Sequence, residues 1–156
     1  MGKGGRPKGP VPADAARQLR TETPRSTAQE KPTFCFAHVD RNANNLWAFN
    51  PSGEHMIEIV EFIGQMGQST WAQIEAMRTG GKDRHRKHHS YNVDSFASAA
   101  QADFHKAHLG EQFGHDMFRF RLAGEKRLWG FRDHAVFRVV WWDPEHEVCP
   151  SEKGHT

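Results

Sequence analysis

The sequence has few cysteines and no long apolar run. These two absences argue against a disulfide-stabilised protein and against a membrane-spanning protein. Its 156 residues include only Cys35 and Cys149, without CxxC spacing, so a disulfide framework is not expected. No apolar run approaches the roughly 18 residues that a membrane helix needs, and no secretory h-region stands at the N-terminus. We therefore expect a cytoplasmic protein with no membrane partner.

Several enzyme signatures are also missing. The chain has no nucleotide-binding glycine motif, no nucleophile elbow and no HExxH. His85 with His89, and His105 with His108, have spacings that could hold a metal on a helix, but no acidic or cysteine partner stands nearby at ligand spacing. The sequence therefore predicts neither a cofactor nor a bound metal.

Charge is distributed unevenly along the chain. The net charge is +2, yet residues 1–31 contain seven Lys/Arg against three acids, so this segment is +4 and the remainder is −2. Residues 1–32 are rich in Gly, Pro, Ala and Thr and show no apolar periodicity. We expect a disordered basic tail over 1–32, a single domain over 33–150 and a disordered tail over 151–156.

The residue patterns predict an α+β domain. Alternation over residues 33–39 predicts an N-terminal strand, and residues 46–49 could return as a hairpin. Helical spacing follows over 54–66, and a capping-box pattern at Thr70 opens a second helix that Gly80 and Gly81 end. A third helix is expected from Asp94 or Ser95 until Gly110, which makes two to three helices in all.

Residues 117–150 predict a three-stranded antiparallel meander. Its two turns are expected at 123–125 and 133–134, and the apolar run 136–142 is typical of a strand covered on both faces. Gly130 in mid-strand predicts a close approach by another group, and Trp141 and Trp142 are expected in the core. The cations of this sheet are expected to form a platform for a polyanion; they are Arg119, Arg121, Lys126, Arg127 and Arg132.

A second basic cluster lies before the third helix. Its five cations within ten residues attract phosphate, although a solvated loop would have the same composition. The candidate nucleic-acid contacts there are Arg78, Lys82, Arg84, Arg86 and Lys87, to which the meander adds Lys126.

His146 is the candidate proton shuttle. It follows the last strand in the run Asp-Pro-Glu-His-Glu, where it could activate a ribose 2′-hydroxyl while arginines stabilise the phosphorane charge. The same run is also a good turn, in which His146 would have only a capping role. The candidate catalytic residues are Arg119, Arg121, Arg127 and His146.

The order of a strand, a helical hairpin and an Arg- and aromatic-rich meander resembles the RelE/ParE-like bacterial toxin superfamily over about residues 33–148. The run GEKRLWGFR…VFRVVWWDPEHEV also resembles proteins of bacteria and their phages that have no assigned activity. RelE-like members cleave mRNA on the ribosome with basic residues and a terminal Tyr or His, and ParE-like members act on gyrase. The resemblance implies corresponding roles here for Arg119, Arg121, Lys126, Arg127 and His146, and an antitoxin as a possible partner.

Two features depart from that pattern. The only tyrosine, Tyr91, is far from the last strand in sequence, and residues 80–91 with the third helix enlarge the usual short fold. The leading hypothesis is a metal-independent endoribonuclease that acts on mRNA, and the alternative is a non-catalytic module that binds nucleic acid or the ribosome.

Overall fold

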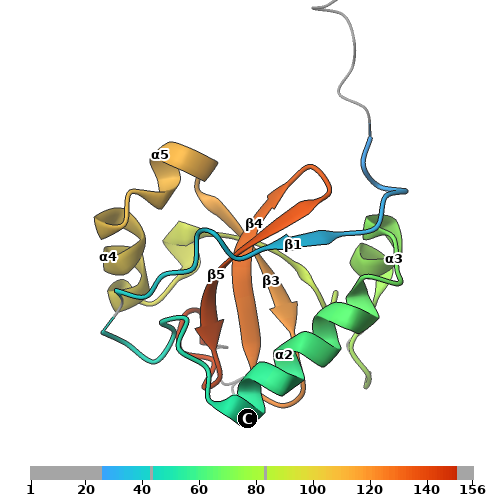
Figure 1. Cartoon of the computed structure of the whole chain (residues 1–156), viewed down its shortest axis with the longest axis horizontal. Coiled ribbons are helices and arrows are strands. Elements are labelled where there is room, and N and C mark those ends of the chain that lie inside the picture. The colour runs from blue at the N-terminus through green and yellow to red at the C-terminus, as the bar shows by residue number, and fades with distance from the viewer. Residues whose placement is uncertain (1–25, 43, 83, 151–156) are drawn as a thin grey trace, which may run out of the picture.

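The computed structural model describes residues 26–42, 44–82 and 84–150 and has the predicted α+β class, with a five-stranded mixed sheet between two helical layers (Figure 1). The predicted tails at 1–25 and 151–156 lie outside the described residues. The elements in chain order are β1 (Thr33–Cys35), α2 (Gly53–Met66), α3 (Trp71–Ala76), β2 (His89–Asn92), the 3-10 turn η1 (Val93–Ser95), α4 (Ser98–Lys106), α5 (Leu109–Phe113), β3 (Asp116–Arg121), β4 (Arg127–Asp133) and β5 (Val136–Asp143).

The sheet is wider than the predicted three strands. Its order is β1-β5-β4-β3-β2, with β1 parallel to β5 and all other neighbours antiparallel. The edge strand β2 was not predicted, because its sequence HSYN has only one large apolar side chain. These residues form a strand because their backbone pairs with β3. The possible return strand at 46–49 is wrong, since those residues form turns.

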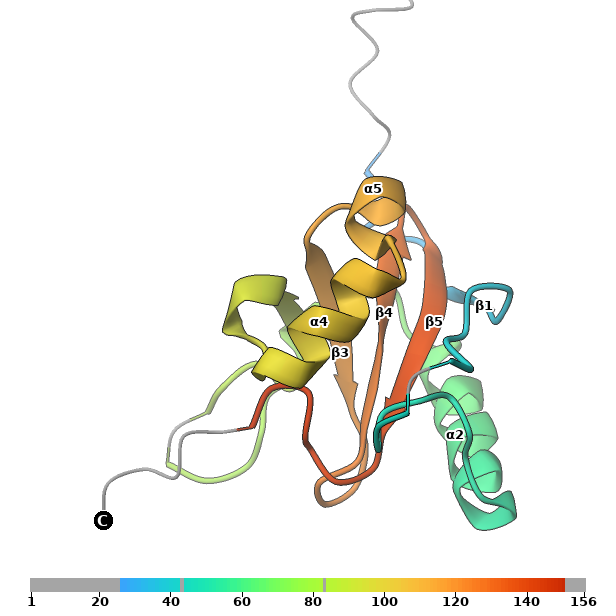
Figure 2. The same cartoon turned by 90° about the vertical axis from the view of Figure 1, so that its left-hand side faces the viewer.

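Both faces of the sheet are buried, each against different helices. One face packs on α2 and α3 through Phe118 and Phe120, and the other packs on η1, α4 and α5 through Met117 and Trp129. The two helical layers lie on opposite sides of the strands when the molecule is turned (Figure 2). Burial on both faces explains why the last strand is apolar almost throughout.

Trp141 and Trp142 are both in the core, as predicted, and lie on opposite faces of the sheet. Each of the five indole N–H groups donates a hydrogen bond to a defined acceptor, so large aromatics are buried without an unpaired donor. The pairs are Trp47 with Asp103, Trp71 with the Ala135 carbonyl, Trp129 with Asp143, Trp141 with Asp40, and Trp142 with His55.

A bulge occurs where β4 meets β5. The pairing shifts between Trp129, opposite Trp141, and Gly130, opposite Val139, so β5 has one extra residue there. A Cβ at Gly130 would lie 2.1 Å from the Arg138 carbonyl oxygen, which confirms the close approach expected at this glycine.

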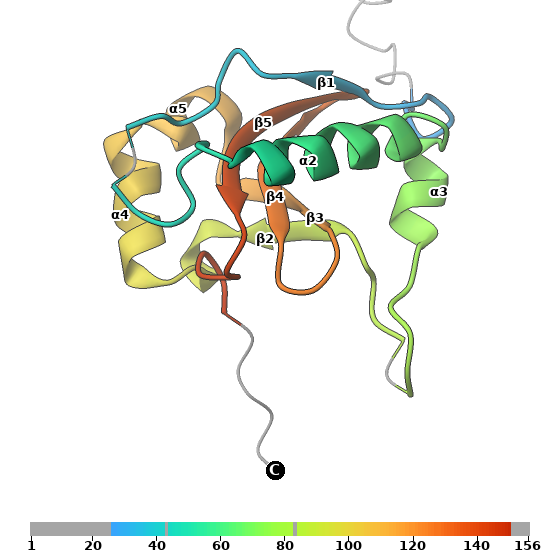
Figure 3. The same ribbon diagram turned by 60° about the horizontal axis from the view of Figure 1, so that its bottom comes forward.

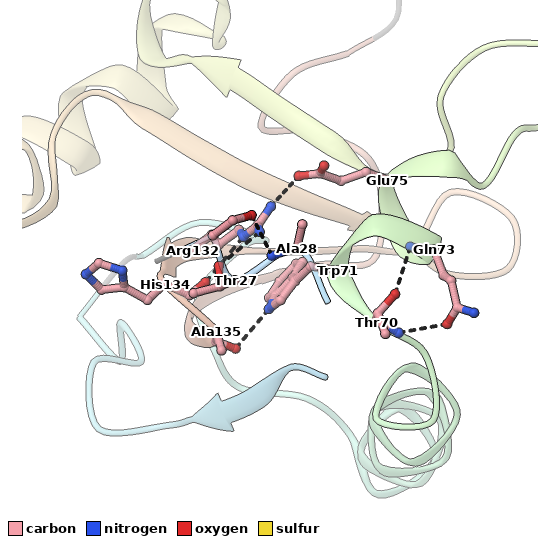
Figure 4. A network of polar contacts seen from close by, with 10 residues as sticks. Thr27, Ala28, Thr70, Trp71, Gln73, Glu75, Arg132, His134 and Ala135 are labelled. Atoms are coloured by element: carbon pink, nitrogen blue, oxygen red, sulfur yellow. Dashed lines mark hydrogen bonds and ion pairs between the residues drawn. The ribbon is translucent and has the colours of Figure 1, made fainter. Parts of the chain in front are cut away.

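The helices agree with the sequence signals only in part: α3 ends at Ala76, before the predicted stop at Gly80 and Gly81, and α4 begins after Ala97, not at Asp94 or Ser95. Thr70 and Gln73 form both halves of the predicted capping box (Figure 4). In α2, however, Ile57 and Val60 are exposed although the spacing places them on the inner face. The predicted third helix is divided into η1, α4 and α5. The extended backbone at Phe96 separates η1 from α4, and the left-handed conformation of His108, with φ 53°, separates α4 from α5.

Arg132 does not belong to a cationic platform with the other meander arginines. Its guanidinium pairs with Glu75 of α3 and lies 4.4 Å from the centroid of the Trp71 ring, on the α2/α3 side (Figure 4). Residues 26–32, which the sequence places in the tail, also lie there: the Ala28 and Glu30 carbonyls accept hydrogen bonds from the first residues of α3.

Candidate functional site

Three segments project from the same side of the molecule: the β3–β4 turn, residues 143–150 after β5, and residues 77–82 and 84–88 between α3 and β2 (Figure 3). The last two segments and strands β2, β3 and β4 border a hollow of about 280 Å³ on the α4/α5 face, beyond the part that these helices cover. We call this hollow the cationic recess, and it is lined by Thr79, His85, Arg86, His89, Tyr91, Arg119, Arg121, Arg127 and His146.

The recess brings together all four residues that the sequence suggests for catalysis. Arg119 and Arg121 alternate along β3, and the register places Arg121 opposite Arg127 of β4. Alternation across paired strands therefore directs the three guanidinium groups to one site. His146 reaches the same site from the turn after β5.

The recess arginines form no ion pair with a described acid, although the charge of buried Asp143 still acts to raise the pKa of Arg119 and Arg127. Within the described residues, no carboxylate lies within ion-pair distance of Arg119, Arg121 or Arg127. Other arginines of the sheet are neutralised locally, as in the pair between Arg138 and Asp133 at 3.0 Å. The positive charge of the recess is therefore available to an anion.

Two of these arginines are sheltered rather than presented to water as the platform model implies. Arg119 is 7% exposed and Arg127 is 4% exposed, and the Nε of each is buried without a hydrogen-bond partner. The Arg127 Nη1 donates to the carbonyls of Gly124 and Lys126, at 2.8 and 2.9 Å, which fixes the guanidinium at the β3–β4 turn. Unpartnered buried donors are rare in proteins and mark a place where a ligand acceptor would be stabilised.

Burial and repulsion between neighbouring arginines lower the pKa of Arg119 and Arg127. Burial first, and then the neighbouring Arg119 and Arg121, lower the pKa of Arg127 to about 10. Burial also lowers the pKa of Arg119. With a pKa of about 10, Arg127 still carries its charge at neutral pH, so the recess concentrates positive charge in a partly dehydrated space.

His146 has an unusual backbone and an unusual environment. Its φ of 57° is left-handed, and its Nε2 is buried without a partner. Burial, followed by the charges of Arg127 and Arg119, lowers the pKa of His146 to about 4. The imidazole is therefore neutral at pH 7 and can accept a proton.

Asp143 holds the turn that positions His146. This fully buried carboxylate accepts hydrogen bonds from the backbone N–H of Glu147 at 2.8 Å and of Val148 at 3.1 Å, and from the Trp129 indole at 3.3 Å. Burial raises the pKa of Asp143, while these donors oppose that rise. The role of Asp143 depends on its burial, so the sequence alone does not distinguish it from the other acids of the turn.

The described residues of the basic cluster, 77–82 and 84–88, form an arm held by backbone hydrogen bonds. Thr79 N–H donates to the His85 carbonyl at 2.8 Å and Lys87 N–H donates to the Met77 carbonyl at 2.9 Å, so the arm is a short antiparallel ladder. At its base, buried His88 accepts a hydrogen bond from the backbone N–H of Arg121 at 3.0 Å.

The arm divides its cations among three places. Arg86 faces the cationic recess, whereas Arg78 and Lys87 line a second hollow beside it. Lys82 and Arg84 are exposed and line neither hollow. Lys126, expected with the nucleic-acid contacts, instead pairs with Glu58 of α2 at 2.7 Å.

Tyr91 is the residue that sequence reasoning missed. It is far from β5 in the sequence, but β2 pairs with β3 and places it in the same recess as His146. His85 and His89 also join the recess from outside the predicted set. The sequence HSYN contains too little apolar surface to indicate this strand by itself, so its place in the recess depends on the pairing with β3.

No group of three or more His, Cys, Asp or Glu side chains in the described ranges is arranged to hold a metal ion. Among the helices of those ranges, none has the length and apolar character required to cross a membrane.

Comparisons with protein-family models, curated proteins and solved structures found no match.

Proposed function

We propose that the cationic recess binds a phosphodiester of RNA and promotes its cleavage without a metal ion. One observation carries this proposal: Arg119, Arg121 and Arg127, none with an acidic partner among the described residues, surround a neutral imidazole in one recess. Planar guanidinium groups match the oxygen geometry of phosphate, and their sheltered setting strengthens that interaction.

RNA is the substrate because the chemistry uses a 2′-hydroxyl. The imidazole of His146 removes the proton of the ribose O2′, which attacks the adjacent phosphorus. The O2′–P bond forms and the P–O5′ bond breaks, leaving a 2′,3′-cyclic phosphate and a 5′-hydroxyl. Arg119, Arg121 and Arg127 stabilise the charge of the phosphorane.

Tyr91 is the acid that we assign to the leaving group. Burial raises its pKa, so the phenol stays protonated at neutral pH and can donate to O5′ as the bond breaks. The guanidinium of Arg119 lies over its ring and stabilises the developing phenolate. Solvent exchange then returns the proton from His146 to bulk water and reprotonates Tyr91.

Binding of the phosphate prepares His146 for its role. Burial, and then the positive charge of Arg127 and Arg119, lower the pKa of His146, and a bound phosphate anion offsets the effect of that charge. The pKa of His146 therefore rises towards neutrality when the substrate is present, which makes it a stronger base where it is needed.

The toxin-like organisation of the sequence extends the proposal to mRNA, with the ribosome as a platform and an antitoxin as a regulator. A non-catalytic RNA-binding module is the second candidate. It is favoured by Lys82 and Arg84, which extend positive charge along the arm beyond the recess and are not needed for catalysis.

The test is incubation of the purified protein with end-labelled mRNA in EDTA, with and without ribosomes. The proposal expects fragments with 2′,3′-cyclic phosphate ends from the wild type and at least about a hundredfold slower cleavage by His146→Ala. Retention of RNA without fragments would favour the binding module, and neither retention nor cleavage would contradict both.

A further inference from the structure

A second hollow of about 440 Å³ opens directly beside the cationic recess. The two hollows share Thr79 of the arm and Arg121 of β3, so they meet at these two residues. We call the second hollow the side recess. Its volume lies in the range of about 300–1,000 Å³ that is typical of small-molecule sites.

The lining of the side recess differs in chemistry from that of the cationic recess. Phe62, Met66 and Leu122 form an apolar wall from α2 and the end of β3. The exposed amide of Gln65 stands at the border, and Arg78 and Lys87 contribute positive charge from the arm. Among the described residues that line it, none is acidic.

This combination fits one nucleoside with its flanking phosphate. An apolar wall accepts the face of a base, an amide can hydrogen-bond to its edge, and the cations attract the backbone. A base in a duplex is stacked and paired, so it reaches such a hollow only after it leaves the stack.

We propose that the side recess holds the unpaired nucleoside next to the phosphodiester bound in the cationic recess, with Arg121 between the two subsites. This inference rests on the proposed function and adds to it: the substrate is single-stranded RNA, and the neighbouring base contributes to affinity. Arg121 is suited to the boundary because it lines both hollows and its backbone N–H donates a hydrogen bond to His88 at the base of the arm.

The test measures binding of a fluorescein-labelled RNA trinucleotide with 2′-O-methyl riboses, which prevent cleavage. Two further probes each lack one terminal base. In the wild type, loss of the seated base should weaken binding about tenfold. The double variant Gln65→Ala/Arg78→Gln should bind the complete trinucleotide about tenfold more weakly, and loss of that base should then have no further effect.

Gln65 and Arg78 are both exposed, so these substitutions should leave folding intact, which thermal denaturation would verify. Lys106→Gln is the control, because it removes one exposed positive charge from α4, outside both hollows. It should change affinity by less than about twofold at moderate salt. The side recess is overturned if the double variant matches the wild type, or if base removal weakens both proteins equally.

Arg119→Gln separates this inference from the proposed function. If Arg119→Gln weakens binding of all three probes while the double variant has no effect, the phosphate site stands and the side recess is wrong. If Arg119→Gln binds every probe as the wild type does, the proposed function itself fails. A hairpin duplex with tenfold weaker wild-type binding than the trinucleotide would support the requirement for an unpaired base, and equal binding would contradict it.

Discussion

The guanidinium of Arg119 lies over the ring of Tyr91, with its central carbon 4.6 Å from the ring centroid. This contact joins the edge strand β2 to β3 and places the chain's only tyrosine in the cationic recess. Although β2 has little apolar content, its Tyr91 side chain has a defined partner in Arg119 of β3. The contact also places a phenol in the recess that the three arginines line.

Tyr91→Phe separates the hydroxyl from the ring. The variant keeps the contact with Arg119, so RNA affinity should stay within about twofold of the wild type. Cleavage should slow by about a hundredfold because the leaving group loses its acid. Single-turnover rates and binding of a 2′-O-methyl RNA measure the two effects, and unchanged cleavage would remove Tyr91 from the mechanism.

Asp143→Ala should reduce both stability and cleavage. It removes the acceptor of three N–H groups in the buried turn, so the free energy of unfolding should fall by about 2–4 kcal/mol. His146 then loses its fixed position. Urea unfolding measures the stability, and Glu145→Ala, an exposed position in the same turn, should stay within about 0.5 kcal/mol. Equal effects of the two substitutions would show that the carboxylate does not hold the turn.

His88 should make the protein sensitive to acid. Burial, followed by the charge of Lys87, lowers its pKa from 6.5 to about 3. Above pH 6.5 both states are neutral, whereas between pH 6.5 and about 3 the unfolded chain binds a proton that the folded protein does not. Stability therefore falls as the pH decreases through this window, by up to about 1.4 kcal/mol per pH unit for this group.

The check is urea unfolding from pH 7 to pH 4.5 for the wild type and His88→Asn. The Asn oxygen can replace the Nδ1 acceptor for the Arg121 N–H but does not titrate in this range. The variant should show a shallower loss of stability towards acid. Parallel pH profiles would mean that His88 is protonated in the folded protein.

Gly130→Ala tests the bulge that aligns β4 with β5. The new Cβ would overlap the Arg138 carbonyl oxygen, and backbone cannot yield as a flexible side chain can, so unfolding should become easier by more than about 3 kcal/mol. Gly64→Ala in α2 meets no atom within 4 Å and should stabilise by about 0.5–1 kcal/mol. Equal stabilities of the two variants in urea would contradict the bulge.

The sequence predicts well what depends on alternation and capping. The sharing of a site by Arg119, Arg121 and Arg127 follows from the period of two residues and a tight turn, and Thr70 follows from its partner Gln73. Arg132 shows the limit of grouping by charge alone. It lies five residues after Arg127, so it points to the other face of β4, where α3 supplies Glu75.

Other features depend on tertiary pairing that no local pattern encodes. β2 exists because β3 offers a free edge, and its four residues contain too little apolar surface to indicate a strand by themselves. The exposure of Ile57 and Val60 reflects how α2 is rotated against the sheet, since Ile59 and Met66 are buried instead. Such a rotation is decided by the packing of the whole layer.

The most direct test of the central claim is the salt dependence of binding to a 2′-O-methyl RNA by Arg121→Gln and Arg132→Gln. Both substitutions remove one arginine charge, but only Arg121 lines the recess, whereas Arg132 is paired with Glu75. The account predicts that Arg121→Gln weakens binding about tenfold and lowers the salt slope by about 0.7, the value for one lost phosphate contact, while Arg132→Gln changes neither. Equal losses of affinity and slope in the two variants would contradict a phosphate site in the cationic recess.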